Sequence, residues 1–142
     1  MADVHDSDTR SYNMSQIKSK DTRPELMVRK FLHSRGFRYK LHVKKLPGKP
    51  DLVLPKYYTV IHVHGCFWHA HKDCKYFKIP KTRTKWWEDK LFGNRERDKL
   101  NIKKIEDMGW NVITIFECEL KDGKALDTLT SLSNQIKENY HD

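Results

Sequence analysis

The stretch from His62 to Cys74, HVHGCFWHAHKDC, holds four histidines and two cysteines within thirteen residues. Within it, Cys66, His71 and Cys74 are separated by four residues and then by two, a spacing typical of metal ligands. The third cysteine of the chain, Cys118, would complete a Cys₃His set. Such a set leaves no coordination position open, so the sequence predicts a structural zinc that fixes an otherwise irregular loop. The alternative is that these cysteines are small, buried apolar side chains.

The other side chains of this stretch are suited to a different task. His64 and His69 fall outside the metal-ligand spacing, and a histidine that holds no metal titrates near neutral pH. Phe67 and Trp68 are too apolar for a solvated loop unless they pack against something or insert into it. The loop therefore combines a predicted metal site with free histidines and a pair of aromatic rings.

The charge of the chain favours a polyanionic partner. Lysine and arginine total 28 against 19 aspartates and glutamates, a formal net charge of +9, and the basic residues recur from Lys18 to Lys104. Basic side chains release counterions when they meet phosphates, and the four tryptophans supply rings that stack on or between bases. These features indicate nucleic acid, and a basic solvated surface is the alternative.

The length and the N-terminus of the chain define the expected class of protein. A chain of 142 residues is expected to form a single domain over residues 1–142. No run approaches the ~20 apolar residues of a membrane span. The acidic, polar start MADVHDSDTR is unlike a secretory signal. We therefore expect a cytoplasmic protein with reduced cysteines and no membrane contact.

Hydrophobic periodicity and turn residues predict an alternation of helices and strands. Thr22, Pro24 and Glu25 form a helix start with threonine as N-cap, and Gly36 ends this helix. Strands are expected at 37–43, 51–54, 57–63 and 110–116, and further helices at 84–108 and 127–139. The apolar run at 110–116 predicts a central strand. This order predicts an α/β (α+β) fold, a mixed sheet flanked by helices.

Three residues have the chemistry of a hydrolytic metal site. Glu25 lies in the first turn of the first predicted helix, Asp51 begins a strand, and His64 ends the next strand. Carboxylate oxygens are preferred ligands of Mg²⁺, and a nearby histidine can take a proton from water. Each residue also has a simpler explanation: a capping box for Glu25, a turn cap for Asp51, and a backbone carbonyl partner for His64.

Several segments, taken in order, resemble the very-short-patch repair (Vsr) endonucleases. They are NMSQI at 13–17, LPGKPD at 46–51, HGCFWH at 64–69, TRT at 82–84, WWE at 86–88, NRERD at 94–98, GW at 109–110 and FEC at 116–118. The resemblance implies a fold similar to that of type II restriction endonucleases, with a zinc-stapled loop. It covers most of the chain and leaves only the C-terminal segment without a recognisable motif.

The resemblance also implies an activity on double-stranded DNA. Members of this family nick DNA at T:G mismatches that arise when 5-methylcytosine deaminates, on the 5′ side of the mismatched T, and a short patch is then resynthesised. It implies a functional link to a cytosine-5 DNA methyltransferase and a location at the bacterial nucleoid. We expect a monomer, because no dimerisation helix is evident.

The resemblance implies specific roles for the site residues. Asp51 would bind the catalytic Mg²⁺ directly, beside the backbone carbonyl of Val63. Glu25 and His64 would hold metal-bound waters, and His69 would act as general base. The ligands of the structural zinc would be Cys66, His71, Cys74 and Cys118.

The aromatic residues match the wedge of this family. Phe67, Trp68 and Trp87 would enter next to the mismatch from the major groove, and Met14 from the minor groove. The alternative is that the rings pack in a core, which we favour for Trp110.

Contacts with DNA are also expected outside the wedge. Lys90, Asn94 and Arg97, on the helix that follows the loop, would touch bases or phosphates. Residues 1–20 would form an N-terminal segment that contacts DNA and is partly disordered without it.

Four positions depart from the family pattern. Val63 stands where threonine is common, and only its carbonyl is needed. The loop from His71 to Cys74 is one residue longer, which the spacing rules for zinc tolerate. His62 replaces an apolar residue and is read as a strand residue rather than an extra proton carrier. Trp86 doubles the tryptophan at the next position.

Two other functions compete with the nicking enzyme. One is a zinc-stapled DNA-binding module without catalysis, which has no reason to assemble Glu25, Asp51, His64 and His69. The other is a nuclease that cuts both strands, which would usually require a dimer.

Overall fold

The computed structural model describes residues 21–140. Its helices and strands are α2 (Arg23–Ser34), β1 (Lys40–Leu41), β2 (Leu52–Leu54), β3 (Thr59–His64), α3 (Thr84–Asp107), β4 (Asn111–Phe116) and α4 (Ala125–Glu138). Short 3₁₀ turns follow β2 (Pro55–Tyr57) and β4 (Glu117–Leu120). Met14 and the rest of segment 1–20, for which DNA contacts are predicted, lie outside the described residues.

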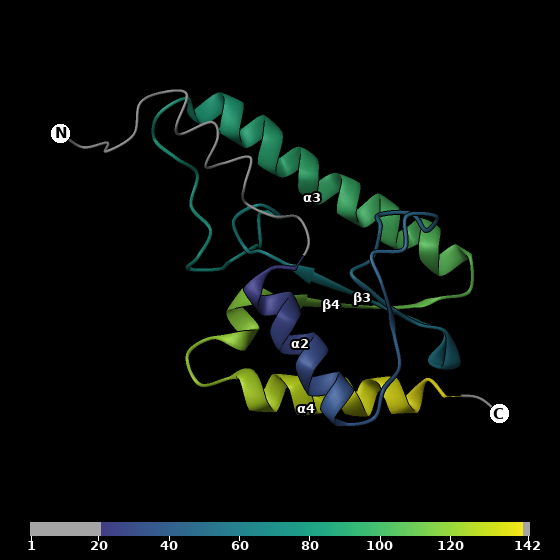
Figure 1. Cartoon of the computed structure of the whole chain (residues 1–142). Helices are drawn as coiled ribbons and strands as arrows, with labels where there is room; N and C mark the ends of the chain where they lie inside the picture. Colours follow the sequence, from purple (N-terminus) through teal and green to yellow (C-terminus); the bar gives the residue numbers. More distant parts are fainter. Residues whose placement is uncertain (1–20, 141–142) are drawn as a thin grey trace.

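The strands form one mixed sheet in the order β1-β2-β3-β4. The pairs β1–β2 and β2–β3 are antiparallel, whereas β4 runs parallel to β3 and is reached through α3. The long helix α3 lies along one face of the sheet, and α2 and α4 lie together on the other (Figure 1). The predicted mixed sheet flanked by helices is therefore confirmed.

Apolar clusters on both faces of the sheet hold these layers together. The larger lies between the sheet and the pair α2–α4, and Ile61 and Val63 of β3 belong to it. The smaller contains Val60 of β3 and Ile105 of α3. Because side chains alternate along a strand, His62 and His64 point to the same face as Val60, towards α3. The histidines of β3 therefore lie between the sheet and α3.

The prediction of a central strand at 110–116 is wrong. Among the described residues, β4 is an edge strand that pairs only with β3, and the strands with a partner on each side are β2 and β3. The apolar run at β4 has another cause: helices cover both faces of the sheet here, so Val112 packs on the α3 side and Ile115 on the α2–α4 side. Burial on both faces produces a continuous apolar run whether or not the strand is central.

The strand predicted at 37–43 is much shorter than expected. Only Lys40–Leu41 pairs with β2. His42 takes a left-handed backbone conformation, with φ of 49°, which ends the extended segment. Phe37 lies outside the paired strand, and its side chain packs in the larger core cluster.

The helix α3 spans 24 residues and carries mainly charged and polar side chains. Only Leu91 and Ile105 of α3 are buried. Of the helices formed by residues 21–140, none has the length and apolar character required to cross a membrane.

Candidate functional site

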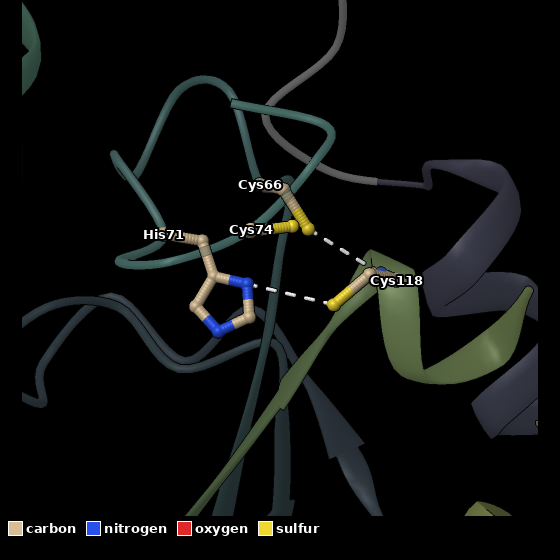
Figure 2. Close-up of side chains that lie close together, drawn as sticks. All are labelled: Cys66, His71, Cys74 and Cys118. Carbon is tan, nitrogen blue, oxygen red and sulfur yellow. Dashed lines mark hydrogen bonds between the residues drawn. The ribbon is translucent and has the colours of Figure 1, made fainter. Parts of the chain in front are cut away.

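The loop after β3 returns to the end of β4 and gathers the four predicted zinc ligands (Figure 2). The ligand atoms of Cys66, His71, Cys74 and Cys118 all lie within 4.8 Å of one another. His71 Nδ1 lies 3.5 Å from Cys118 Sγ, and the Cys118 amide donates to Cys66 Sγ at 3.3 Å. The His71 ring is fixed by stacking on Phe116, with ring centres 3.8 Å apart.

The chemistry of this donor set fits zinc. Burial raises the pKa of Cys66 to about 12, and burial also raises the pKa of Cys118. Burial also acts to raise the pKa of Cys74, but hydrogen bonds from the Tyr76 amide and the neighbouring thiols outweigh this effect, so the pKa is lowered. A bound cation ionises coordinating thiols outright, and a tetrahedral Zn–S distance of ~2.3 Å places ligands ~3.8 Å apart. The Cys/His cluster is therefore consistent with a zinc site.

A second cluster contains Asp51, the residue directly before β2. Its Oδ2 accepts a hydrogen bond from the Val63 amide at 2.7 Å, in the place of the backbone acceptor that a longer β2 would offer. The N–H and C=O of one strand residue point to the same side, so the Val63 carbonyl also faces this edge. Burial raises the pKa of Asp51 to about 7; the Val63 amide opposes the rise and the charge of Glu25 adds to it.

Glu25 supplies the other carboxylate of this cluster. The predicted helix cap is confirmed, because the Glu25 amide donates to Thr22 Oγ1 at 3.3 Å. The Glu25 side chain is almost fully buried and accepts hydrogen bonds from Arg29 Nη1 at 3.2 Å and His42 Nε2 at 2.9 Å. The charge of Glu25 opposes ionisation of the nearby Asp51, and a divalent cation with a preference for oxygen ligands would offset that. The residues present fit Mg²⁺.

The role of His42 could not be inferred from the sequence. It lies in an alternating polar and apolar run that is read as a strand. The left-handed turn at this residue, together with an amide hydrogen bond to the Asp51 carbonyl at 3.0 Å, brings its ring to Glu25.

A third cluster contains His64 and His69, the two histidines of residues 62–74 that fall outside the predicted zinc ligands and the interior of β3. The rings of His64 and His69 stack with centres 3.7 Å apart and an angle of 2° between planes. Asp98 of α3 accepts a hydrogen bond from His69 Nδ1 at 2.6 Å and lies 4.0 Å from His64 Nδ1. Burial, with a smaller contribution from the neighbouring His69, lowers the pKa of His64 to about 2. His64 is therefore neutral near pH 7.

Asp98 is a second functional residue that sequence reasoning missed. It lies in the NRERD segment, but the reading assigned DNA contacts to its neighbours and no role to the carboxylate. Helical spacing could have indicated this role, because residues 87, 91, 94 and 98 share one face of α3. The first of these residues, Trp87, belongs to the predicted wedge. A carboxylate on that face points towards the loop.

His62 lies next to this cluster and makes no hydrogen bond through Nε2, which is buried. Its ring centre is 5.2 Å from that of His64. Burial lowers the pKa of His62 to about 4, so the ring is neutral near pH 7. Its position inside β3 agrees with the interpretation of His62 as a strand residue.

The predicted wedge residues pack against one another at the start of α3. Phe67 and Trp68 meet edge to face with ring centres 5.1 Å apart, and Trp87 lies 5.5 and 6.0 Å from them. All three are half-buried and belong to neither of the buried apolar clusters. Trp110 packs against the smaller cluster, as we expected. Trp86, 45% exposed, meets Trp87 edge to face.

The three predicted DNA contacts on α3 have different surroundings. Lys90 is exposed and lies over the Trp86 ring. Arg97 is exposed and donates to Asn94 Oδ1 at 3.0 Å. Asn94 itself donates to the Trp68 carbonyl at 3.0 Å, so in this structure its side chain holds the loop.

Comparison with known proteins shows which family the chain resembles. A family model described as DNA mismatch endonuclease Vsr matches residues 2–76. The chain is 46% identical over 140 residues to the type II nicking enzyme V.NmeAIP of Neisseria meningitidis serogroup A, covering 97% of this chain and 99% of the relative. It is 45% identical to the type II nicking enzyme V.XorIIP of Xanthomonas oryzae, covering 89% and 93%. It is 41% identical to the DNA mismatch endonuclease Vsr of Escherichia coli K12, covering 97% and 87%.

Proposed function

The chain belongs to the Vsr family of DNA mismatch endonucleases and is a DNA-nicking hydrolase, and on this premise we propose that it nicks DNA at T:G mismatches. The bond cut is the phosphodiester on the 5′ side of the mismatched T, the base that deamination of 5-methylcytosine leaves opposite G. The nick starts resynthesis of a short patch. The enzyme acts as a monomer and accompanies a cytosine-5 DNA methyltransferase.

The observation that supports a nuclease is the continuity of the carboxylate and histidine clusters. Asp51 is bonded to the amide of Val63, and the next residue along β3 is His64, which stacks on His69. A protein that only bound DNA would gain nothing from burying carboxylates beside stacked imidazoles, because burial of such groups is unfavourable unless they are used or compensated.

The carboxylate cluster is the proposed Mg²⁺ site. Asp51 and the Val63 carbonyl would hold the ion directly, and Glu25 and His64 would hold water around it. When bound there, the ion would polarise the scissile phosphate and stabilise the leaving oxygen. His64 is neutral because burial lowers its pKa to about 2, so it does not repel a cation. His42 and Arg29 orient Glu25 through their hydrogen bonds to its carboxylate.

His69 is the proposed general base. A carboxylate oxygen only accepts hydrogen bonds, so the 2.6 Å contact with Asp98 makes Nδ1 of His69 the donor. In the neutral ring this contact leaves Nε2 as the nitrogen without a proton, which can accept one from the attacking water. Asp98 fixes the tautomer and stabilises the imidazolium that results.

The aromatic group supplies the preference for a mismatch. Insertion of Phe67, Trp68 and Trp87 unstacks one base step, which costs least where pairing is already weak. The exposed cations Lys90 and Arg97 lie further along the same helix and would neutralise phosphates.

We expect Trp68→Ala to lower the preference for T:G over matched DNA by about tenfold, because stacking of one aromatic ring on a base contributes ~1–3 kcal/mol. The measurement is the ratio of the Kd values for the two duplexes by fluorescence anisotropy. Trp110→Phe is the matched control, since this tryptophan packs against the smaller core cluster. An unchanged ratio in Trp68→Ala would remove this residue from the wedge.

The proposed function is tested with a duplex that carries one T:G mismatch and a different label on each strand. We expect a nick only in the T strand, 5′ to the T, that requires Mg²⁺, and no cut in the matched T:A duplex. EDTA should stop the reaction and excess Mg²⁺ restore it, with zinc content measured in both samples so that loss of zinc is not mistaken for loss of magnesium. Binding without a cut in several flanking sequences would instead support a zinc-stapled binding module.

A further inference from the structure

Three side chains of α3 hold three consecutive residues of the loop that follows β3. Asn94 donates to the Trp68 carbonyl, Asp98 accepts from the His69 ring, and Arg95 donates to the Ala70 carbonyl. The proposed wedge, the proposed base and the approach to the zinc cluster are therefore all fixed from one helix. Arg95 lies in the NRERD segment, but of the three side chains it is the one to which the mechanism above gives no role.

Ala70 is held in an unusual conformation. It is fully buried, and its φ of 48° lies in the left-handed region, which residues with a Cβ rarely adopt. Its neighbours in the chain are the proposed base His69 and the predicted zinc ligand His71. A change in the backbone at this residue would rotate the peptide that carries the His69 side chain.

Arg95 makes a forked contact with this residue. Its Nε and one Nη lie 2.9 and 2.6 Å from the Ala70 carbonyl oxygen. The guanidinium also lies over the Phe92 ring, 4.9 Å from its centre, which limits its rotation. Two donors in a rigid plane fix the direction of a carbonyl group, whereas the single ammonium of a lysine does not.

We propose that Arg95 is a positioning residue for nicking: it fixes the left-handed Ala70 peptide and thereby holds His69 against Asp98 and His64. This inference rests on the proposed function, in which His69 takes the proton from water. It predicts that Arg95 affects the rate of bond cleavage and not the affinity for DNA, because its donors face the loop backbone and not a phosphate.

The test compares Arg95→Ala and Arg95→Lys with wild type in single-turnover nicking of the T:G duplex. We expect the rate to fall by about 30- to 100-fold in the alanine variant, the scale of a small misplacement of a catalytic group. The Kd for the duplex and its salt dependence should not change. Methylguanidinium should restore part of the rate of Arg95→Ala but none of that of Arg95→Lys, whose side chain fills the space.

Arg35→Ala is the matched control. This exposed arginine also lies over an aromatic ring, Phe31, at 4.6 Å, and its loss removes the same charge from a helix end remote from the loop. It should nick at the wild-type rate. Zinc content and melting temperature are measured for all variants.

A second readout does not depend on activity. The ring signals of His69, assigned by NMR against a His69→Asn variant, should move in both Arg95 variants without DNA and stay in place in Arg35→Ala. Wild-type rates in both Arg95 variants, or slower nicking that follows loss of zinc while the His69 signals stay fixed, would overturn the proposal. If wild type cuts no duplex, the proposed function fails, and displaced or unmoved His69 signals still decide whether Arg95 positions this ring.

Discussion

Asp51→Asn should abolish nicking and leave binding of the T:G duplex intact. The substitution keeps the shape of the side chain and an oxygen to accept from the Val63 amide, but it removes the charge of the one residue proposed to hold Mg²⁺ directly through its side chain. A catalytic ion contributes several kcal/mol to the transition state, so the expected loss is about a thousandfold or more. Single-turnover rates with saturating enzyme measure it.

The same variant should be at least as stable as wild type in Mg²⁺-free buffer, which separates loss of chemistry from loss of folding. The pKa of Asp51 is raised to about 7 in the folded chain, above its usual value of 3.8. The folded state therefore holds a proton that the unfolded chain releases, and this contribution to stability is lost as the pH rises towards 7. Asparagine carries no charge at any pH, so at pH 8 its melting temperature should equal or exceed that of wild type.

Two results would contradict this role for Asp51. One is nicking by Asp51→Asn within tenfold of the wild-type rate. The other is a large fall in melting temperature, which would identify a structural role. Asp89→Asn serves as the control for removal of one negative charge, because Asp89 is an exposed carboxylate on α3 that forms an ion pair with Lys85.

Removal of zinc should unfold the loop and with it much of the domain. Structural zinc contributes about 10 kcal/mol in small metallo-peptides, and whole domains have a net stability of only ~5–15 kcal/mol. A strong chelator, or Cys118→Ser, should therefore cause a large fall in melting temperature and loss of nicking. Zinc should restore the chelated wild type, and Mg²⁺ alone should not.

Cobalt substitution gives an independent check on the ligands. Co²⁺ in a tetrahedral site with three thiolates should show intense visible absorption, and His71→Ala should weaken it, whereas the exposed histidine His33 should be replaceable by alanine without effect. A chelated protein that keeps its melting temperature would mean that the four residues are held by packing alone.

The sequence predicted the parts of the site that lie on short motifs. The spacing of Cys66, His71 and Cys74 indicated a cluster, and the fourth ligand, Cys118, followed from the small number of cysteines. The capping signature placed Glu25 in the first turn of a helix, whereas its role at the metal site was inferred from carboxylate chemistry and from the family resemblance. These predictions depend on residues close in sequence or on rare residue types, and the structure brings them together.

Residues whose role depends on tertiary packing left no such signal. His42 reaches Glu25 because of a left-handed turn, and Asp98 and Arg95 reach the loop because α3 lies across it. The edge position of β4 was missed for a related reason: burial by helices on both faces gives an edge strand the composition of a central one. An apolar run in the sequence indicates that a strand is buried, but it does not indicate which neighbouring helices or strands bury it.

The cysteine cluster also has a consequence for how the chain reaches its fold. The parallel pair β3–β4 joins segments far apart in sequence, and such pairing forms late because a long loop must close first. Cys66 and Cys118 are 52 residues apart and follow the two strands directly. A cation that bound both in the unfolded chain would close that loop in advance, at an entropic cost that grows only slowly with loop length. The metal site would then hold together the two ends of the β3–α3–β4 crossover, at the end of the sheet where β3 and β4 must pair.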